Sequence, residues 1–282
     1  MSPRRGARLS GTRVVITGAA GGIGTASVDA LNRRGARVIG VDLTASEGVI
    51  AADVRDGQSV ERAISECVRR LGGLDILVNN AGIGRAQDSG DFPDEESRAV
   101  LDVNFFGAWN ATAAALPHLL SSRGHVVNVS SGLAFVDLPF AAAYSASKRA
   151  LAAYSAALRV EYRGRITVST VYPGYVRTSI HDVPSAAGAS LEGLVRADTV
   201  QGAAAAIVRA CERKPRSIAT SRLSSLELWA ARRFPHVTEA VIANRVRAWA
   251  RSRPAPGFVR FPEDQAWRVA PERPSTGGSA EG

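Results

Sequence analysis

The stretch TGAAGGIG, from Thr17 to Gly24, follows a short apolar run and precedes a segment with the spacing of a helix. Gly18 allows a tight turn, Gly22 lets backbone approach a pyrophosphate, and Gly24 lets the helix pack closely on the strand. The first amides of that helix, among them Ile23, would face the phosphates. With an acidic residue at the end of the next strand, this loop indicates a dinucleotide-binding βαβ unit and predicts an α/β fold.

The alternation of strand and helix continues along the chain. We expect strands at 13–18, 36–42, 48–54, 74–82, 124–131 and 165–174, and a weaker seventh one at 216–220. We expect the helices at about 22–34, 56–72, 95–121, 144–162 and 199–212. Continuous apolar strands between helices predict a doubly wound parallel sheet, the Rossmann fold, with seven strands and helices on both faces. Such a sheet binds ligands at the carboxyl ends of its strands.

Composition excludes several classes of protein. The 282 residues include only two cysteines, Cys67 and Cys211, outside any C-x-x-C pattern, so we expect neither a disulfide framework nor a thiolate zinc site. The four histidines fit no metal spacing, so no metal is expected. Between Arg209 and Arg260 twelve basic residues face three acids, which accounts for the whole net charge of +9. A near-neutral body with a basic C-terminal part does not predict nucleic-acid binding.

We divide the chain into a dinucleotide-binding and catalytic domain at 1–220, a basic extension at 221–262 and a disordered tail at 263–282. The extension reads as two short amphipathic helices separated at Pro235. They are expected to pack on the domain or on a neighbouring subunit. A second interpretation is peripheral membrane contact through three aromatic residues, Trp229, Phe234 and Trp249. Without a secretory signal or an apolar run of about 18 residues, we expect a cytoplasmic protein, with membrane association as the variant.

Two acidic residues at strand ends bear on the cofactor. Asp42 ends the second strand, where a carboxylate binds both ribose hydroxyls of NAD and repels the extra phosphate of NADP. The sequence therefore favours NAD over NADP. Asp53, with Val54 beside it, follows the third strand and is a candidate contact for the adenine, or else a simple strand-end cap.

The stretch AAAYSASKRAL, from Ala141 to Leu151, places Tyr144 and Lys148 on one face of a helix, four residues apart. Beside a nicotinamide cofactor, a tyrosine there can act as general acid or base. An ammonium close by would lower the pKa of the phenol by favouring the phenolate. The spacing therefore predicts a catalytic pair.

Four motifs in order, TGAAGGIG, NNAG at 79–82, YSASK at 144–148 and PGYVRT at 173–178, resemble the signatures of the short-chain dehydrogenase/reductase family over about residues 12–220. The resemblance implies a catalytic set of Asn104, Ser131, Tyr144 and Lys148, with Ser130 as a rival to Ser131. Tyr144 would be the acid/base and Lys148 would bind the nicotinamide ribose. It also implies cofactor contacts from Asn80, Ala81, Gly82, Pro173, Gly174, Val176 and Thr178.

The resemblance implies hydride transfer between NAD(H) and an alcohol or ketone. Apolar residues around the serine favour a lipophilic secondary alcohol or ketone, bound by Ser131, Leu133, Phe135, Tyr144 and Tyr175. One alternative is an NADP-dependent biosynthetic ketoreductase. Another, of a different class, is a nucleotide-binding regulator without turnover. The resemblance also implies a homodimer or homotetramer.

Overall fold

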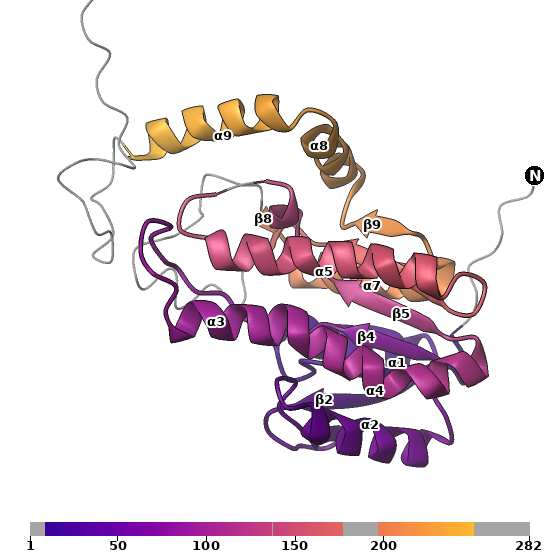
Figure 1. Ribbon diagram of the computed structural model, residues 1–282. Coiled ribbons are helices and arrows are strands. Elements are labelled where there is room, and N and C mark those ends of the chain that lie inside the picture. Colours follow the sequence, from indigo (N-terminus) through magenta and orange to yellow (C-terminus); the bar gives the residue numbers. More distant parts are fainter. Residues whose placement is uncertain (1–8, 137, 177–196, 251–282) are drawn as a thin grey trace, which may run out of the picture.

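The computed structural model describes residues 9–136, 138–176 and 197–250, and its centre is a parallel sheet of seven strands (Figure 1). The strand order is β3-β2-β1-β4-β5-β6-β9, which reverses direction between β1 and β4. This confirms the predicted doubly wound sheet, including its weak seventh strand. The strands are β1 Arg13–Thr17, β2 Arg37–Asp42, β3 Val49–Ala51, β4 Ile76–Asn79, β5 His125–Val129, β6 Thr167–Tyr172 and β9 Ser217–Ala219.

Helices cover both faces of the sheet because its strands are apolar on both sides. On one face, α1 (Gly22–Arg33) and α7 (Val200–Arg213) share a core with β1 and β4. On the other, α2 (Gly57–Leu71), α4 (Gly107–Ser122) and α5 (Ala142–Glu161) form a second core. Because all seven strands run parallel, the strand ends that carry the predicted motifs lie along one edge of the sheet.

The glycine loop is shaped by steric contact. Gly18 adopts φ +66°, and a Cβ there would lie 2.6 Å from Cα of Ala81. A Cβ on Gly24 would lie 1.9 Å from the carbonyl oxygen of Gly18. The chain can therefore turn from β1 into α1 at this closeness only where these positions lack side chains.

The long helix expected at 95–121 is interrupted. It consists of α3 (Glu95–Leu101), a π-helical turn η1 (Asp102–Phe106) and α4. Asn104 lies in that turn, fully buried, and its amide bonds to Ile83 on the neighbouring loop. A wider turn is a local deviation that periodicity does not reveal, because the apolar pattern continues through it.

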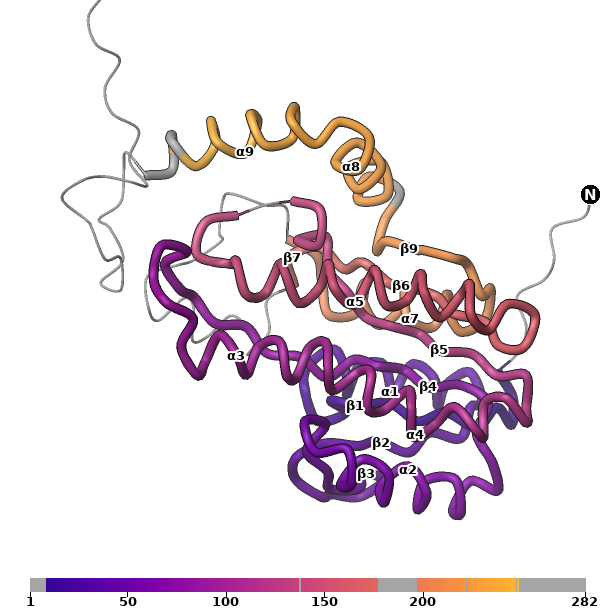
Figure 2. Tube along the Cα trace, viewed as in Figure 1, coloured from indigo at the N-terminus to yellow at the C-terminus, as the bar shows by residue number. Residues whose placement is uncertain are grey.

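The C-terminal extension contains α8 (Arg222–Arg233) and α9 (Pro235–Ala250), which extend along the top of the sheet's C-terminal half (Figure 2). Leu228 packs with Ala134 and Tyr172, and Ile242 packs with Leu138 and Ala141. In the described part of the chain, no helix combines the length and apolar character that crossing a bilayer requires. The division at residue 220 stays a prediction, and the tail at 263–282 lies outside the described residues.

Replacing Gly24 with alanine tests the close approach in the loop. We expect Gly24→Ala to lower the free energy of unfolding by about 1–3 kcal/mol, the usual cost of overpacking. Gly21→Ala is the matched control, because a Cβ at Gly21 would find its nearest neighbour at 3.5 Å. Urea unfolding of both variants measures the difference, and equal stabilities would contradict this account of the loop.

Candidate active site

The amine of Lys148 is a buried cation near the carboxyl ends of the strands. Its side chain is 3% exposed, and Nζ donates a hydrogen bond to the carbonyl oxygen of Val129 at 3.1 Å. Nζ also lies 5.7 Å from the ring centroid of Tyr144. No carboxylate pairs with Lys148 among the described residues. A buried ammonium normally has an ionic partner, so this one has binding capacity left for a ligand.

Burial shifts the pKa of both residues of the pair. It lowers the pKa of Lys148 from 10.5 to about 8. It raises the pKa of Tyr144, and a hydrogen bond with Ser131 lowers it by a smaller amount. The lowering that we expected from the ammonium is absent from these causes. In the protein alone, Tyr144 is therefore a neutral phenol, a proton donor rather than a base.

The two adjacent serines have different partners. Ser131 caps a short 3₁₀ turn, η2 (Gly132–Ala134), with its Oγ accepting from the amide of Leu133 at 3.2 Å, and it also bonds to the Tyr144 hydroxyl. Ser130 instead donates its hydroxyl to the carbonyl oxygen of Lys148 at 2.8 Å. The geometry thus favours Ser131 as the serine that faces the tyrosine, while Ser130 anchors α5.

Asn104 holds the loop after β4 against α5. Its Oδ1 accepts from the amide of Ile83 at 2.8 Å, and its Nδ2 donates to the Ile83 carbonyl and to Ser147 Oγ, both at 3.0 Å. Ser147 in turn donates to the carbonyl oxygen of Tyr144 at 2.7 Å. The amide is therefore engaged with protein groups, and its part in a water relay stays a prediction.

At the glycine loop, Asp42 accepts hydrogen bonds from two backbone amides. Oδ2 accepts from Ala20 and Oδ1 from Leu43, both at 2.8 Å. A carboxylate has about four acceptor positions, so each oxygen keeps one for a ribose hydroxyl. Asn80 reinforces the loop by donating to the carbonyl oxygens of Thr17 and Gly18.

The residues after β3 are engaged within the protein. Asp53 pairs with Arg55 at 2.6 Å, which lowers the pKa of this carboxyl group. The side chain of Val54 is buried in the core, against Gly107 of α4, and its carbonyl accepts from Asn110. A contact between Val54 and a nucleotide would therefore come from its backbone, and the cofactor contacts of Asp53 and Val54 stay predictions. Ile23, in the first turn of α1, is half-buried, and its side chain packs against the core of this face of the sheet.

The turn after β6 is fixed by an acid that sequence reasoning missed. Gly174 donates its amide to Asp198 Oδ2 at 2.8 Å, and the Pro173 carbonyl accepts from Gly132 at 2.8 Å. A two-stranded parallel pair, β7 (Tyr175–Val176) and β8 (Ala197–Asp198), brings Asp198 to this turn. Thr178 lies outside the described residues.

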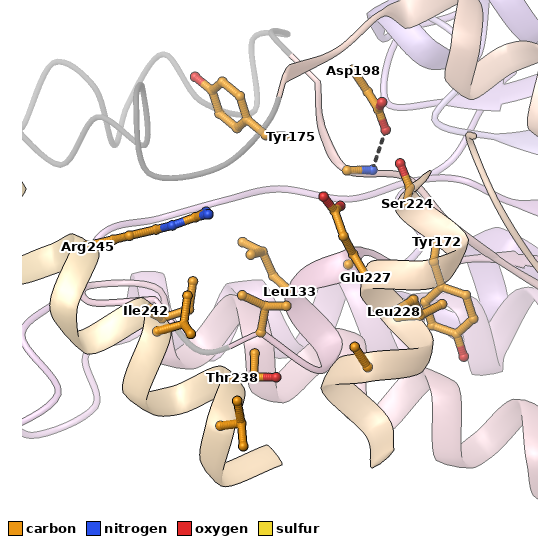
Figure 3. Close-up of a pocket in the computed structure, with 16 residues that line it drawn as sticks. Leu133, Tyr172, Tyr175, Asp198, Ser224, Glu227, Leu228, Thr238, Ile242 and Arg245 are labelled. Atoms are coloured by element: carbon orange, nitrogen blue, oxygen red, sulfur yellow. Dashed lines mark hydrogen bonds between the residues drawn. The ribbon is translucent and has the colours of Figure 1, made fainter. Parts of the chain in front are cut away.

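A cavity of about 490 Å³ opens beside this turn (Figure 3). Leu133 and Tyr175, two of the predicted substrate-binding residues, line it together with Gly132 and Gly174. Phe135 does not: its ring packs against Tyr172 beneath Arg232, which removes it from the expected pocket wall. Neither Ser131 nor Tyr144 lines the cavity, although Gly132, the residue directly after Ser131, does. The remaining lining comes from Val136, Tyr172, Asp198, Ser224, Glu227, Leu228, Ala230, Val237, Thr238, Val241, Ile242 and Arg245.

Most of the missed lining residues lie on α8 and α9. On α8, Leu223 and Leu226 are 54% and 60% exposed, whereas Leu228 is buried and lines the cavity. An amphipathic pattern shows that a helix has an apolar face but not which surface covers it. No signal in the sequence singled out Asp198, Glu227 or Arg245.

The residues present fit a nicotinamide dinucleotide. The first turn of α1 has no side-chain cap and no acid, which leaves its amides for phosphates. Asp42 has acceptor positions for a ribose. Gly82 leaves open the space beside the buried amine, because a Cβ there would lie 3.3 Å from Lys148 Nζ. No such support exists for a metal site: in the described part of the chain, no three His, Cys, Asp or Glu side chains lie close enough together to bind a metal ion.

Comparisons with known proteins agree with this arrangement. The family model described as short chain dehydrogenase matches residues 12–186. Oxidoreductase UcpA of Salmonella typhimurium is 36% identical over 188 residues, covering 61% of this chain and 72% of the relative. The 11-beta-hydroxysteroid dehydrogenase-like 2 of Arabidopsis thaliana is 32% identical over 61% of each chain. A short chain dehydrogenase from Burkholderia cenocepacia, solved in complex with NADP, superposes with TM-score 0.71 at 29% identity, over 83% of this chain and 99% of that one.

Removing the buried charge should stabilise the protein. Because the folded state lowers the pKa of Lys148 to about 8 from 10.5, it disfavours the ammonium at every pH where the unfolded chain keeps its proton. Lys148→Met should therefore have a higher free energy of unfolding than the parent at pH 7. That advantage should shrink as pH rises from about 8 towards about 10.5, where the parent loses the charge in both states.

Urea unfolding of both proteins at pH 7 and near pH 10 measures this. Lys214→Met is a control, because Lys214 is exposed and its removal takes no charge out of the protein interior. A Lys148→Met protein less stable than the parent at pH 7 would show that Lys148 has a stabilising partner and would contradict the description of an uncompensated cation.

Proposed function

The chain belongs to the short-chain dehydrogenase family of oxidoreductases acting on CH–OH groups, and we propose that it transfers a hydride between NAD(H) and a lipophilic secondary alcohol or ketone, with Tyr144 as general acid/base. The observation that carries the proposal is the uncompensated amine of Lys148, buried between Tyr144 and the open space at Gly82. A structural lysine would have been paired or exposed. An amine that must bind a neutral ribose and act on a phenol needs neither.

Each residue of the site then has a stated task. When bound, the nicotinamide ring gives or takes the hydride. Ser131 and Tyr144, whose hydroxyls interact, would both bind the substrate oxygen. In reduction Tyr144 donates its proton to that oxygen, for which the raised pKa of the phenol suits it. In oxidation the phenol must first lose its proton, and the charge of Lys148 favours that loss.

Asp42 supports NAD as the cofactor. Its two free acceptor positions suit the two hydroxyls of an adenosine ribose, whereas a phosphate there would meet a carboxylate. The similar Burkholderia cenocepacia protein is described in complex with NADP, so the family accommodates either cofactor. An NADP-dependent ketoreductase is therefore the alternative within the same class.

The cavity walls support a lipophilic substrate. Aliphatic side chains on both sides, from Leu133 and Val136 on one and Leu228, Val241 and Ile242 on the other, favour burial of hydrocarbon. The name of the Arabidopsis thaliana relative, a hydroxysteroid dehydrogenase-like protein, points to the same kind of compound.

Turnover with a panel of hydrophobic alcohols, followed by absorbance of the reduced nicotinamide, tests the proposal. We expect activity with NAD⁺ that falls by about 10³-fold or more in Tyr144→Phe, because one proton-transfer group is lost. Binding of NADH should be kept. Tyr154→Phe is the control, since this tyrosine lies on the same helix, stacked on Trp109 and away from the cavity.

The outcomes separate the alternatives. A strong preference for NADPH would make the chain the NADP-dependent ketoreductase and contradict the role given to Asp42. Nucleotide binding without turnover of any alcohol or ketone would favour the regulator without catalysis.

The expected homodimer or homotetramer stays a prediction. Its support is the pair Phe106 at the end of η1 and Trp109 in α4, which are 48% and 47% exposed, with Trp109 stacked on Tyr154 of α5. Apolar residues gathered on neighbouring helices are typical of contact surfaces.

We further propose that the extension contacts a membrane surface. The cytoplasmic location expected from the sequence stays a prediction. Leu223, Leu226 and Trp229 follow one another at intervals of three along α8, and all are more than half exposed. Arg233 and Phe234 follow at the end of the helix. An exposed apolar row beside cationic side chains suits the surface of an anionic bilayer. Trp249 belongs to the same prediction, but the structure does not describe its side chain.

Flotation with anionic liposomes tests this contact. We expect the full chain to float, and a Leu226→Ser/Trp229→Ser variant to remain at the bottom of the gradient because buried apolar area drives such binding. Val160→Ser, an equally polar change at an exposed site on α5, should float like the parent. Failure of the full chain to float would remove the proposal.

A further inference from the structure

The cavity beside the active site has two charged side chains to which the proposed reaction gives no task. Glu227 lies on α8 and Arg245 on α9, and both line the cavity together with Gly132, Leu133 and Gly174. Gly132 directly follows the serine of the active site, so this cavity is the continuation of the substrate site away from the reacting atoms.

The wall that carries Glu227 is tied to the active-site turn. Asp198 accepts from the amide of Gly174 at 2.8 Å and from the hydroxyl of Thr220. Thr220 also contacts Ser224 Oγ at 3.3 Å, in the first turn of α8. Glu227 follows Ser224 by three residues and therefore shares its face of the helix. The position of Glu227 is thus fixed relative to the turn expected to meet the nicotinamide.

The second wall is placed by packing. On α9, Thr238, Val241, Ile242 and Arg245 form a row at helical spacing, and all four line the cavity. Ile242 is buried against Leu138 and Ala141, which fixes the rotation of this helix. Arg245 thereby lines the cavity as well, and its guanidinium points into the cavity in Figure 3.

Neither charge has an ionic partner in the described part of the chain, and the two are too far apart to form a salt bridge with each other. Both residues are exposed, and around them the cavity wall combines aliphatic side chains with Ser224, Thr238 and a second carboxylate, Asp198. Charged groups on a cavity wall that have no ionic partner are available to a ligand, and their opposite signs select its chemistry. For a ligand group that lies beside both signs, a carboxylate would be repelled by Glu227 and Asp198, and an ammonium by Arg245.

A hydroxyl group suits both, because it donates one hydrogen bond and accepts others. We propose that Glu227 and Arg245 bind a second hydroxyl group of a neutral, lipophilic substrate, remote from the carbon that is oxidised or reduced. The substrate class is therefore a hydrophobic diol or hydroxyketone rather than a simple alcohol. This inference rests on the proposed function, since it takes the cavity as part of the substrate site.

Binding of matched pairs to the full chain saturated with NADH tests the proposal by calorimetry. Each pair consists of a mono-alcohol and the diol of the same skeleton: decanol with decanediol, and a bicyclohexyl mono-alcohol with the corresponding diol. We expect the diol of at least one pair to bind about 10-fold or more tightly, as sites built to bond a hydroxyl discriminate against analogues lacking it.

Two variants and two controls assign the effect. Glu227→Leu and Arg245→Met should each reduce the preference for the diol to about 2-fold or less, with mono-alcohol affinity unchanged, because the lost contact is made only by the second hydroxyl. Glu239→Leu on α9 and Arg233→Met on α8 remove the same charges from positions that do not line this cavity, and should keep the preference.

The results distinguish this inference from the function on which it rests. Equal affinities within every pair, no binding of any pair, or tighter binding of a carboxylate or amine analogue than of the diol would overturn it. A diol preference that both variants abolish, in a protein that turns over no alcohol, would support the site and reject the proposed reaction. Turnover without any diol preference would do the reverse.

Discussion

A lysine amine buried without a carboxylate partner is the constraint on which this structure depends. Desolvation disfavours its charge and lowers its pKa to about 8, yet only one backbone carbonyl, that of Val129, compensates it among the described residues. The fold maintains this position at a cost in stability, as functional sites often do. Ser130, bonded to the Lys148 carbonyl, and Asn104, bonded to Ser147, fix the helix that carries it.

The sheet explains why these groups meet. Parallel strands that share one carboxyl edge bring the loops after β1, β4, β5 and β6 together, although more than 150 residues separate the first of them from the last. Hydrogen bonds between loops then complete the arrangement: Asn80 to the glycine loop, Gly132 to Pro173, and Asp198 to Gly174. These bonds join the loops at the carboxyl edge of the sheet, and α8 and α9 contribute most of the cavity wall.

The sequence predicted the part of this structure that local physics determines. Apolar strands, glycine positions and the Tyr144–Lys148 spacing depend on neighbours within a few residues, so the seven-stranded sheet and the shared helix of Tyr144 and Lys148 followed from them. Ser131 and Asn104 came only from the family resemblance, and the catalytic roles of all four residues stay predictions. The π-helical turn at Asn104, the pair β7–β8 and the burial of Phe135 under Arg232 depend on contacts between distant segments. The sequence predicted a lowered pKa for Tyr144, whereas burial raises it. Spacing along a helix shows that a cation is near the phenol but does not show how strongly the phenol is desolvated.

The central claim is that the amine of Lys148 binds the nicotinamide ribose and that its charge favours loss of the proton from Tyr144. A crystal structure of the chain with NADH and a bound alcohol tests it most directly. The account predicts Lys148 Nζ within hydrogen-bonding distance of the ribose hydroxyls, and the Tyr144 hydroxyl beside the substrate oxygen. An amine that touches no ribose atom, with the phenol turned away from the substrate, would contradict it.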